Sequence, residues 1–146
     1  MSGPEAGRGA PRELTPREID EFLRGQRIAR LGCHAAGVTY VVPIIYAWDG
    51  DCIYVQSIEG RKISMMRDNP QVCFEVDEYD NGSWRSVIVD GTYEELRGDD
   101  AKHALDLLVA RFADRSGNRR RVSAEGVTPV AFRIRPTRMS GRMVQR

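Results

Sequence analysis

Two adjacent cations, Arg61 and Lys62, follow directly on a small-residue turn at Gly60. A helix that begins near Gly60 would direct its unpaired backbone N–H groups and the positive end of its dipole at this turn. The side chains of Arg61 and Lys62 add two full positive charges at the same place. This combination is typical of a site that binds a phosphate group. The alternative interpretation is a surface helix whose first residues are basic and solvated.

The other reactive side chains favour a bound cofactor over catalysis by protein groups. Cys33 and His34 are adjacent in an expected strand, so their side chains face opposite sides and cannot form a nucleophilic pair. His103 lies on the polar side of an expected helix. No histidine–carboxylate cluster has metal-ligand spacing, and no serine lies in a nucleophile elbow. Redox chemistry would therefore belong to a cofactor, beside which the protein positions a substrate.

The elements that must position these residues read as a mainly β domain with a few helices. Hydrophobic alternation and turn residues predict strands at 28–34, 39–47, 52–56, 71–78, 84–96 and 130–134. Three helices are expected: from Pro16 to about Gly25 behind a capping box, from about Gly60 to Asn69, and from a cap at Asp99 or Asp100 to about Phe112. Hairpin connections favour a six-stranded antiparallel barrel over a parallel sheet. Gly91 is expected to form a bulge or a bend in its strand.

The strand through Pro43 is apolar on both faces. Val41, Ile45 and Ala47 point to one side, and Tyr40 together with the other even-numbered residues points to the opposite side. One face can fill a barrel, and the other also needs a cover, which a partner subunit or a planar ligand could supply. Pro43 interrupts the hydrogen-bond ladder, which leaves a backbone group free for something other than a neighbouring strand; an ordinary edge-strand proline is the alternative.

The segment Ser57-Ile-Glu-Gly-Arg-Lys, followed by Asn69-Pro-Gln-Val-Cys-Phe-Glu-Val-Asp77, resembles the pyridoxamine 5′-phosphate oxidase-like flavin-binding split barrels. The resemblance extends over about 15–135 and is strongest to the nitroimidazole-resistance type of small flavoprotein. It implies bound FMN and a homodimer. Many members of that type carry histidine at the position of Gln56, so a mechanism that uses this histidine does not transfer.

The resemblance also implies which residues contact the cofactor. The phosphate-binding basic pair falls on Arg61 and Lys62, with the hydroxyl of Ser57 just before the turn and Gln56 near the flavin. The strand beside the flavin ring falls on 42–46, and a second subunit would add residues from a later strand. The complete implied cofactor set is Val42, Pro43, Ile44, Tyr46, Gln56, Ser57, Arg61, Lys62, Trp84 and Ser86.

The function implied is a flavin-dependent oxidoreductase that acts on a small planar or electron-poor compound, such as a nitroaromatic or a quinone, at the dimer interface. A non-catalytic flavin carrier or sensor is the alternative. A third reading replaces FMN with the deazaflavin F420 or with haem, although the Arg61-Lys62 turn suits the terminal phosphate of FMN and haem has less need of it.

Composition sets the context for this domain. The 146 residues are enough for one domain, expected at 13–136 between a disordered tail at 1–12 and a basic tail at 137–146. A net charge of +1 gives no indication of nucleic acid or an anionic membrane as partner. Three widely spaced cysteines and the lack of an apolar signal or membrane-spanning run predict a reduced, cytoplasmic protein.

Overall fold

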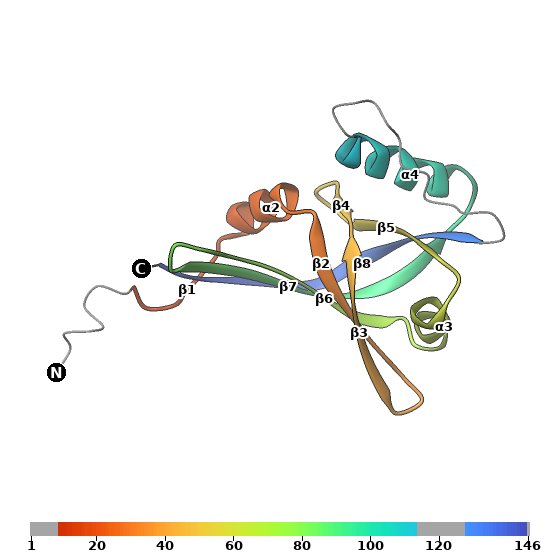
Figure 1. Cartoon of the computed structure of the whole chain (residues 1–146), viewed down its shortest axis with the longest axis horizontal. Helices are drawn as coiled ribbons and strands as arrows, with labels where there is room; N and C mark the ends of the chain where they lie inside the picture. Colours follow the sequence, from red (N-terminus) through yellow and green to blue (C-terminus); the bar gives the residue numbers. More distant parts are fainter. Residues whose placement is uncertain (1–8, 114–127, 146) are drawn as a thin grey trace.

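The computed structural model describes residues 9–113 and 128–145, which form a mainly β fold with three helices (Figure 1). The mainly β prediction is thereby confirmed. The strands of the described part are β1 (Arg12–Glu13), β2 (Ile28–Ala35), β3 (Val38–Ile45), β4 (Ala47–Trp48), β5 (Ile53–Ile58), β6 (Gln71–Asp80), β7 (Ser83–Leu96) and β8 (Pro129–Val144). The helices are α2 (Pro16–Gly25), α3 (Arg61–Asp68) and α4 (Gly98–Phe112).

The described strands belong to one 8-stranded antiparallel sheet with the order β3-β2-β6-β7-β8-β5-β4, and β1 pairs with β8. Six of these strands correspond to the six expected from the sequence. The expected strand at 39–47 is divided at Tyr46 into β3 and the two-residue β4. The additional strand β1 also has two residues, too few for the alternation rule to find. Helix α3 lies at one end of the sheet, and the β6–β7 hairpin extends from the other end (Figure 1).

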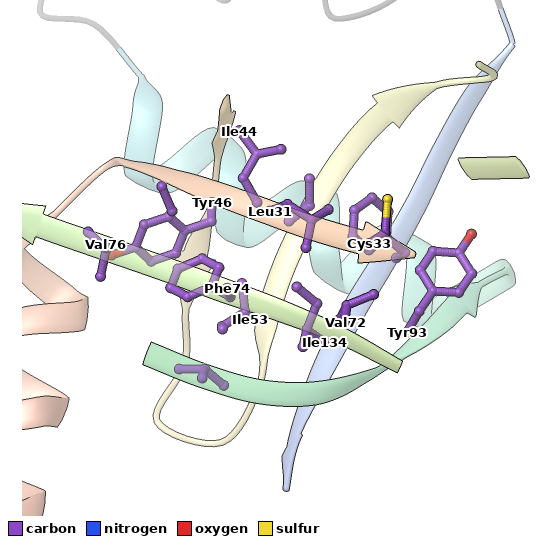
Figure 2. Packing of buried hydrophobic residues seen from close by; sticks show 14 of the residues in the cluster. Leu31, Cys33, Ile44, Tyr46, Ile53, Val72, Phe74, Val76, Tyr93 and Ile134 are labelled. Atoms are coloured by element: carbon purple, nitrogen blue, oxygen red, sulfur yellow. The ribbon is translucent and has the colours of Figure 1, made fainter. Parts of the chain in front are cut away.

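The core lies on the inner face of this sheet, where alternate residues of neighbouring strands meet. Tyr46 and Phe74 are both fully buried near its centre (Figure 2). Their rings pack edge to face with a centroid distance of 4.9 Å. A smaller cluster on the other side of β5 joins Cys52 and Tyr54 to Leu96 and Ala104, and helix α4 covers it.

The N-terminal boundary differs from the predicted one. Helix α2 begins behind the expected capping box, in which Glu18 N donates to Thr15 Oγ1 and Thr15 N donates to Glu18 Oε1. However, the expected tail at 1–12 includes ordered residues, because Arg12 belongs to β1 and Gly9 N donates to Gln145 O at 2.8 Å. A two-residue strand such as β1 is formed by pairing with a distant strand, and it has no hydrophobic alternation by which it could be predicted from the sequence. Residues 1–8 lie outside the described part.

The last strand is longer than the sequence predicted. The expected strand ended at 134 and a tail followed, whereas β8 continues to Val144 and pairs with β7 along its length. The two strands stay paired across an irregularity at the predicted position: the register shifts between Asp90 and Gly91, Pro136 lies opposite Gly91, and Thr137 is the extra residue on β8. A proline can lie at a bulge, where a ladder hydrogen bond is missing in any case. Residues 137–144 are therefore part of the sheet.

Helix α4 also begins slightly earlier than expected. Its N-cap is Arg97, and Asp99 and Asp100 lie in its first turn instead of capping it. Carboxylates in the first turn still stabilise the helix through its dipole. The basic run at 119–121 falls outside the described residues. None of the three described helices is long and apolar enough to cross a bilayer.

Candidate functional site

Helix α3 has an unusual N-terminus. Its N-cap is Gly60, no side chain of the described residues caps it, and its first turn contains no acidic residue. The first hydrogen bond of the helix is the one that Ser64 N donates to Gly60 O. By contrast, α2 has a capping box with Glu18, and α4 carries Asp99 and Asp100 in its first turn. The N-terminus of α3 is therefore left open to an external acceptor.

Arg61 and Lys62 both lie in this first turn. Cations are unfavourable at the positive end of a helix dipole unless an anion is close. The guanidinium of Arg61 lies over the ring of Tyr40, with 4.3 Å between Cζ and the ring centroid. Neither residue belongs to an ion pair among the residues that the structure describes, which are 9–113 and 128–145. Both charges thus lack an anionic partner within that part.

The ammonium group of Lys62 is partly removed from water. Burial lowers the pKa of Lys62, because desolvation disfavours the charged amine. Burial also raises the pKa of the neighbouring Cys33 thiol, against the effect of Arg61 and Lys62. Cys33 is therefore neutral near pH 7 and supplies no negative charge. An anion bound at this turn would compensate the desolvation of Lys62.

Gln56 and Ser57 lie on opposite faces of β5. Tyr54 packs with the cluster under α4, and alternation places Gln56 on that same face. Gln56 Oε1 is buried without a hydrogen-bond partner among the described residues. It faces a cavity of about 390 Å³, whose lining includes Leu96 and Ala101. Arg61 and Lys62 do not line this cavity, so the structure does not join Gln56 to the cationic turn in one described pocket.

In residues 42–46, predicted to lie beside the flavin ring, the groups available to a ligand are mostly backbone groups. Val42 is half-buried and packs against the core, Ile44 is buried, and the hydroxyl of Tyr46 donates to Leu23 O at 2.7 Å. Pro43 is exposed. Because β3 is the last strand of the sheet order, its second edge carries no ladder among the described strands. The backbone along that edge is available for a ligand, whereas the ring of Tyr46 belongs to the core.

Trp84 and Ser86 are remote from the cationic turn within one chain. They lie on β7 opposite Tyr79 and Asp77, close to the hairpin between β6 and β7. Helix α3 instead precedes the other end of β6, a strand of 10 residues that spans roughly 30 Å. Trp84 is 42% exposed. A single site that contains both Trp84 and Lys62 requires two copies of the chain.

Comparison with known proteins identifies the fold family. Residues 15–143 match the family model described as pyridoxamine 5′-phosphate oxidase. The chain belongs to this family. It is 38% identical over 86 residues to the uncharacterized protein RA0666 of Rhizobium meliloti (strain 1021), a match that spans 58% of this chain and 57% of that protein.

Solved structures extend the likeness to nearly the whole chain. An FAD-binding protein (mll6688) from Mesorhizobium loti is 35% identical, with a TM-score of 0.74, over 94% of this chain and 98% of that one. A candidate 5-nitroimidazole antibiotic resistance protein from Bacteroides thetaiotaomicron has a TM-score of 0.72 at 20% identity, over 94% of this chain and 89% of that one. The family prediction is confirmed, but the FAD-binding protein is closer than the nitroimidazole-resistance type, which is similar in fold alone.

Two contacts around the cationic turn at Gly60 were not predicted from the sequence. Tyr40 lies under Arg61, and Arg67 at the end of α3 binds the carboxylates of Glu59 and Glu95. Tyr40 is opposite Cys33 in the β2–β3 ladder, so the pairing of these two strands brings it to α3. No local pattern indicates either contact. Among the described residues, no group of three His, Cys, Asp or Glu side chains could hold a metal ion.

Proposed function

We propose that this chain binds a flavin nucleotide through the phosphate attached to its ribityl chain. The observation that carries this proposal is the uncapped N-terminus of α3, which holds two cations and no acid in its first turn. FMN is the cofactor that the sequence predicts. FAD is the second candidate, because the 35% identical structure is that of an FAD-binding protein and FAD contains the same phosphate.

The described residues fit such a ligand in two places. Arg61, Lys62 and the free N–H groups of α3 would hold the phosphate. The unpaired edge of β3 at Pro43 would offer backbone groups to the polar edge of the flavin ring. The flavin, when bound, supplies hydride and electron transfer. The chain binds and orients it, and the desolvated Lys62 provides an ion pair stronger than one in water.

The test is a comparison of FMN, FAD and riboflavin as ligands of the wild-type protein. We expect FMN to bind at least about tenfold more tightly than riboflavin, because a charge-assisted contact to the phosphate contributes roughly 1.5–3 kcal/mol. Whether FMN or FAD binds more tightly decides which of the two nucleotides is the cofactor. Equal affinities for FMN and riboflavin would contradict the phosphate role. The visible spectrum of the purified protein separates flavin from deazaflavin and haem.

We also propose that the functional unit is a homodimer. The outer face of the sheet exposes apolar side chains on neighbouring strands: Ile28, Val41, Ile45 and Ile88. Arg30 lies on the same face, within 4.0 Å of Glu75 and 3.9 Å of Asp77, so this face carries both signs of charge. In a two-fold symmetric dimer the same face of both subunits meets, so apolar side chains can pack together and opposite charges can pair across the interface. It would also bring Trp84 and Ser86 to the other subunit's cofactor.

The protonation of Glu75 supports the same interface. Burial, together with the neighbouring Asp77, raises the pKa of Glu75 to about 7. A raised pKa lowers the cost of covering this carboxyl group, because its neutral form costs less to bury than a carboxylate.

The dimer is checked by light scattering of the purified protein at low micromolar concentration. We expect about twice the chain mass of 16.5 kDa, because an apolar face shared between copies favours a stable interface. A monomer that still binds flavin with full affinity would contradict both the dimer and a cofactor site shared between two subunits.

The reaction proposed for the bound flavin is reduction or oxidation of a small planar, electron-poor compound at the dimer interface. The exposed ring of Trp84 supports this, since it can wall a flat pocket. We expect the anaerobically reduced protein to be reoxidised by a nitroaromatic or a quinone much faster than free reduced FMN is. Trp84→Ala should slow the reaction measured by stopped flow. Rates equal to those of free flavin across several acceptors would favour a carrier or sensor.

A further inference from the structure

We propose that Arg67 is a positioning residue for the phosphate site and that it works by holding the carboxylate of Glu59 away from the N-terminus of α3. The inference rests on the flavin phosphate site proposed above. It assigns a role to an ion-pair cluster at the other end of the same helix.

Glu59 is the acid nearest in sequence to the cationic turn, because it directly precedes the N-cap Gly60. Its backbone is fixed by the sheet, since β5 ends at Ile58 and Glu59 N donates to Thr128 O at 3.0 Å. The side chain is then held by Arg67, whose Nη1 and Nη2 donate to the two carboxylate oxygens of Glu59 at 3.0 and 2.6 Å. Both oxygens of Glu59 are thus engaged with Arg67.

Arg67 is itself fixed from a second direction. Its Nε and Nη2 donate to the carboxylate of Glu95 at 2.8 and 3.0 Å. Glu95 also accepts from Tyr93 Oη at 2.7 Å and from Arg97 Nη2 at 3.2 Å. Hydrogen bonds from Arg67 first, and from Tyr93 next, lower the pKa of Glu95 to about 2, so this carboxylate stays charged across the physiological range. The end of β7 therefore anchors the guanidinium.

The geometry separates this cluster from an ordinary surface ion pair. An isolated exposed pair contributes little, because water and salt screen it and two long side chains must be ordered. Here one planar guanidinium makes two-point contacts with two carboxylates, from a segment before α3 and from β7. The arrangement fixes the carboxylate of Glu59 on the guanidinium of Arg67, a residue of the last turn of α3.

Without Arg67, the carboxylate of Glu59 would be free to interact with the N-terminus of α3. A carboxylate beside an uncapped helix N-terminus is stabilised by the free N–H groups and by the dipole. Those N–H groups, together with Arg61 and Lys62, are the ones proposed to bind phosphate. A released Glu59 would therefore compete with the ligand for the same donors and repel its charge. Arg67 keeps the turn selective for an external anion.

The test is a double-mutant cycle of Arg67→Gln and Glu59→Gln, with FMN and riboflavin as probes. We expect Arg67→Gln to weaken FMN binding by about tenfold and to leave riboflavin binding unchanged, since one released charge acts only on the phosphate. Adding Glu59→Gln should restore the affinity for FMN to within about twofold of wild type, because no carboxylate is left to compete. Glu59→Gln alone should leave FMN binding equal or tighter. Arg17→Gln, which removes an arginine from an exposed ion pair on α2, is the matched control and should change neither affinity.

Two outcomes would overturn the inference. If Arg67→Gln weakens FMN and riboflavin equally, Arg67 supports the fold and has no specific effect on the phosphate. If the double variant binds FMN as weakly as Arg67→Gln does, Arg67 does not act through Glu59. Neither outcome depends on the wild-type preference for FMN over riboflavin, whose absence would instead contradict the phosphate site itself.

Discussion

Replacing Lys62 with alanine is expected to weaken FMN binding by about tenfold to a hundredfold and to leave riboflavin binding unchanged. The variant removes one of two charge-assisted contacts to the phosphate, and riboflavin has no phosphate to lose. The half-buried position of Lys62 makes it the better choice of the two cations, because a partly desolvated ion pair is less screened than an exposed one. Quenching of flavin fluorescence in a titration measures both affinities.

The chain contains a matched control for this experiment. Lys102 is its only other lysine, and it lies exposed on α4, where it lines the cavity beside Gln56 and is not part of the first turn of α3. Lys102→Ala changes the net charge by the same amount and should leave FMN binding unchanged. An equal loss in both lysine variants would mean that the overall charge of the protein, and not a local contact, determines FMN affinity. An equal loss for riboflavin in Lys62→Ala would point to a damaged fold.

Phe74→Ala is expected to lower the free energy of unfolding by about 3–5 kcal/mol, because it removes a large buried ring and leaves a cavity. Phe74 is fully buried in the centre of β6, and its edge-to-face contact with Tyr46 is lost as well. A domain of this size has a total stability of roughly 5–15 kcal/mol, so the variant should unfold at a much lower urea concentration. Circular dichroism during urea unfolding measures the change.

Phe74→Leu is the control for this prediction. It keeps the site apolar and retains most of the volume, so it should cost less than half as much as the alanine variant. The comparison requires a single protein concentration, since a dimer is stabilised by mass action. A loss below about 1 kcal/mol for Phe74→Ala would mean that the inner face of the sheet is not the well-packed core described above.

Local chemistry allowed much of the chain to be assigned without a structure. The capping box at Thr15 depends on two residues three positions apart, and α2 begins where this box predicts. The bulge at Gly91 was predictable because a glycine interrupts a strand pattern, and the register shifts there. The cationic turn before α3 was found for the same reason, since Gly60, Arg61 and Lys62 are neighbours in the chain. The family resemblance added the prediction that this turn binds a phosphate group.

Contacts between distant segments could not be found in this way. The sequence predicts Tyr46 beside the cofactor, and only the structure shows that the packing of β6 buries its ring against Phe74. Gln56 and Ser57 are adjacent in the sequence, but their side chains lie on opposite faces of β5. Only the position of α4 in the structure shows that the face with Gln56 is the one covered by this helix. The extension of β8 to Val144 depends on β7 as a partner, because residues 137–140 are all exposed and show no alternation of buried and exposed positions.

The sequence by itself determined where α2 and α3 begin, which strands alternate, where the register shift at Gly91 lies and which turn carries two cations at a helix N-terminus. Each of these follows from residues a few positions apart, whose backbone preferences act locally. Only the tertiary structure decided that Arg67 ties Glu59 to Glu95, two carboxylates 36 positions apart in the sequence. Only it separated Trp84 from Lys62 by the length of β6. Such distances depend on sheet pairing and register, which the whole set of strands fixes together.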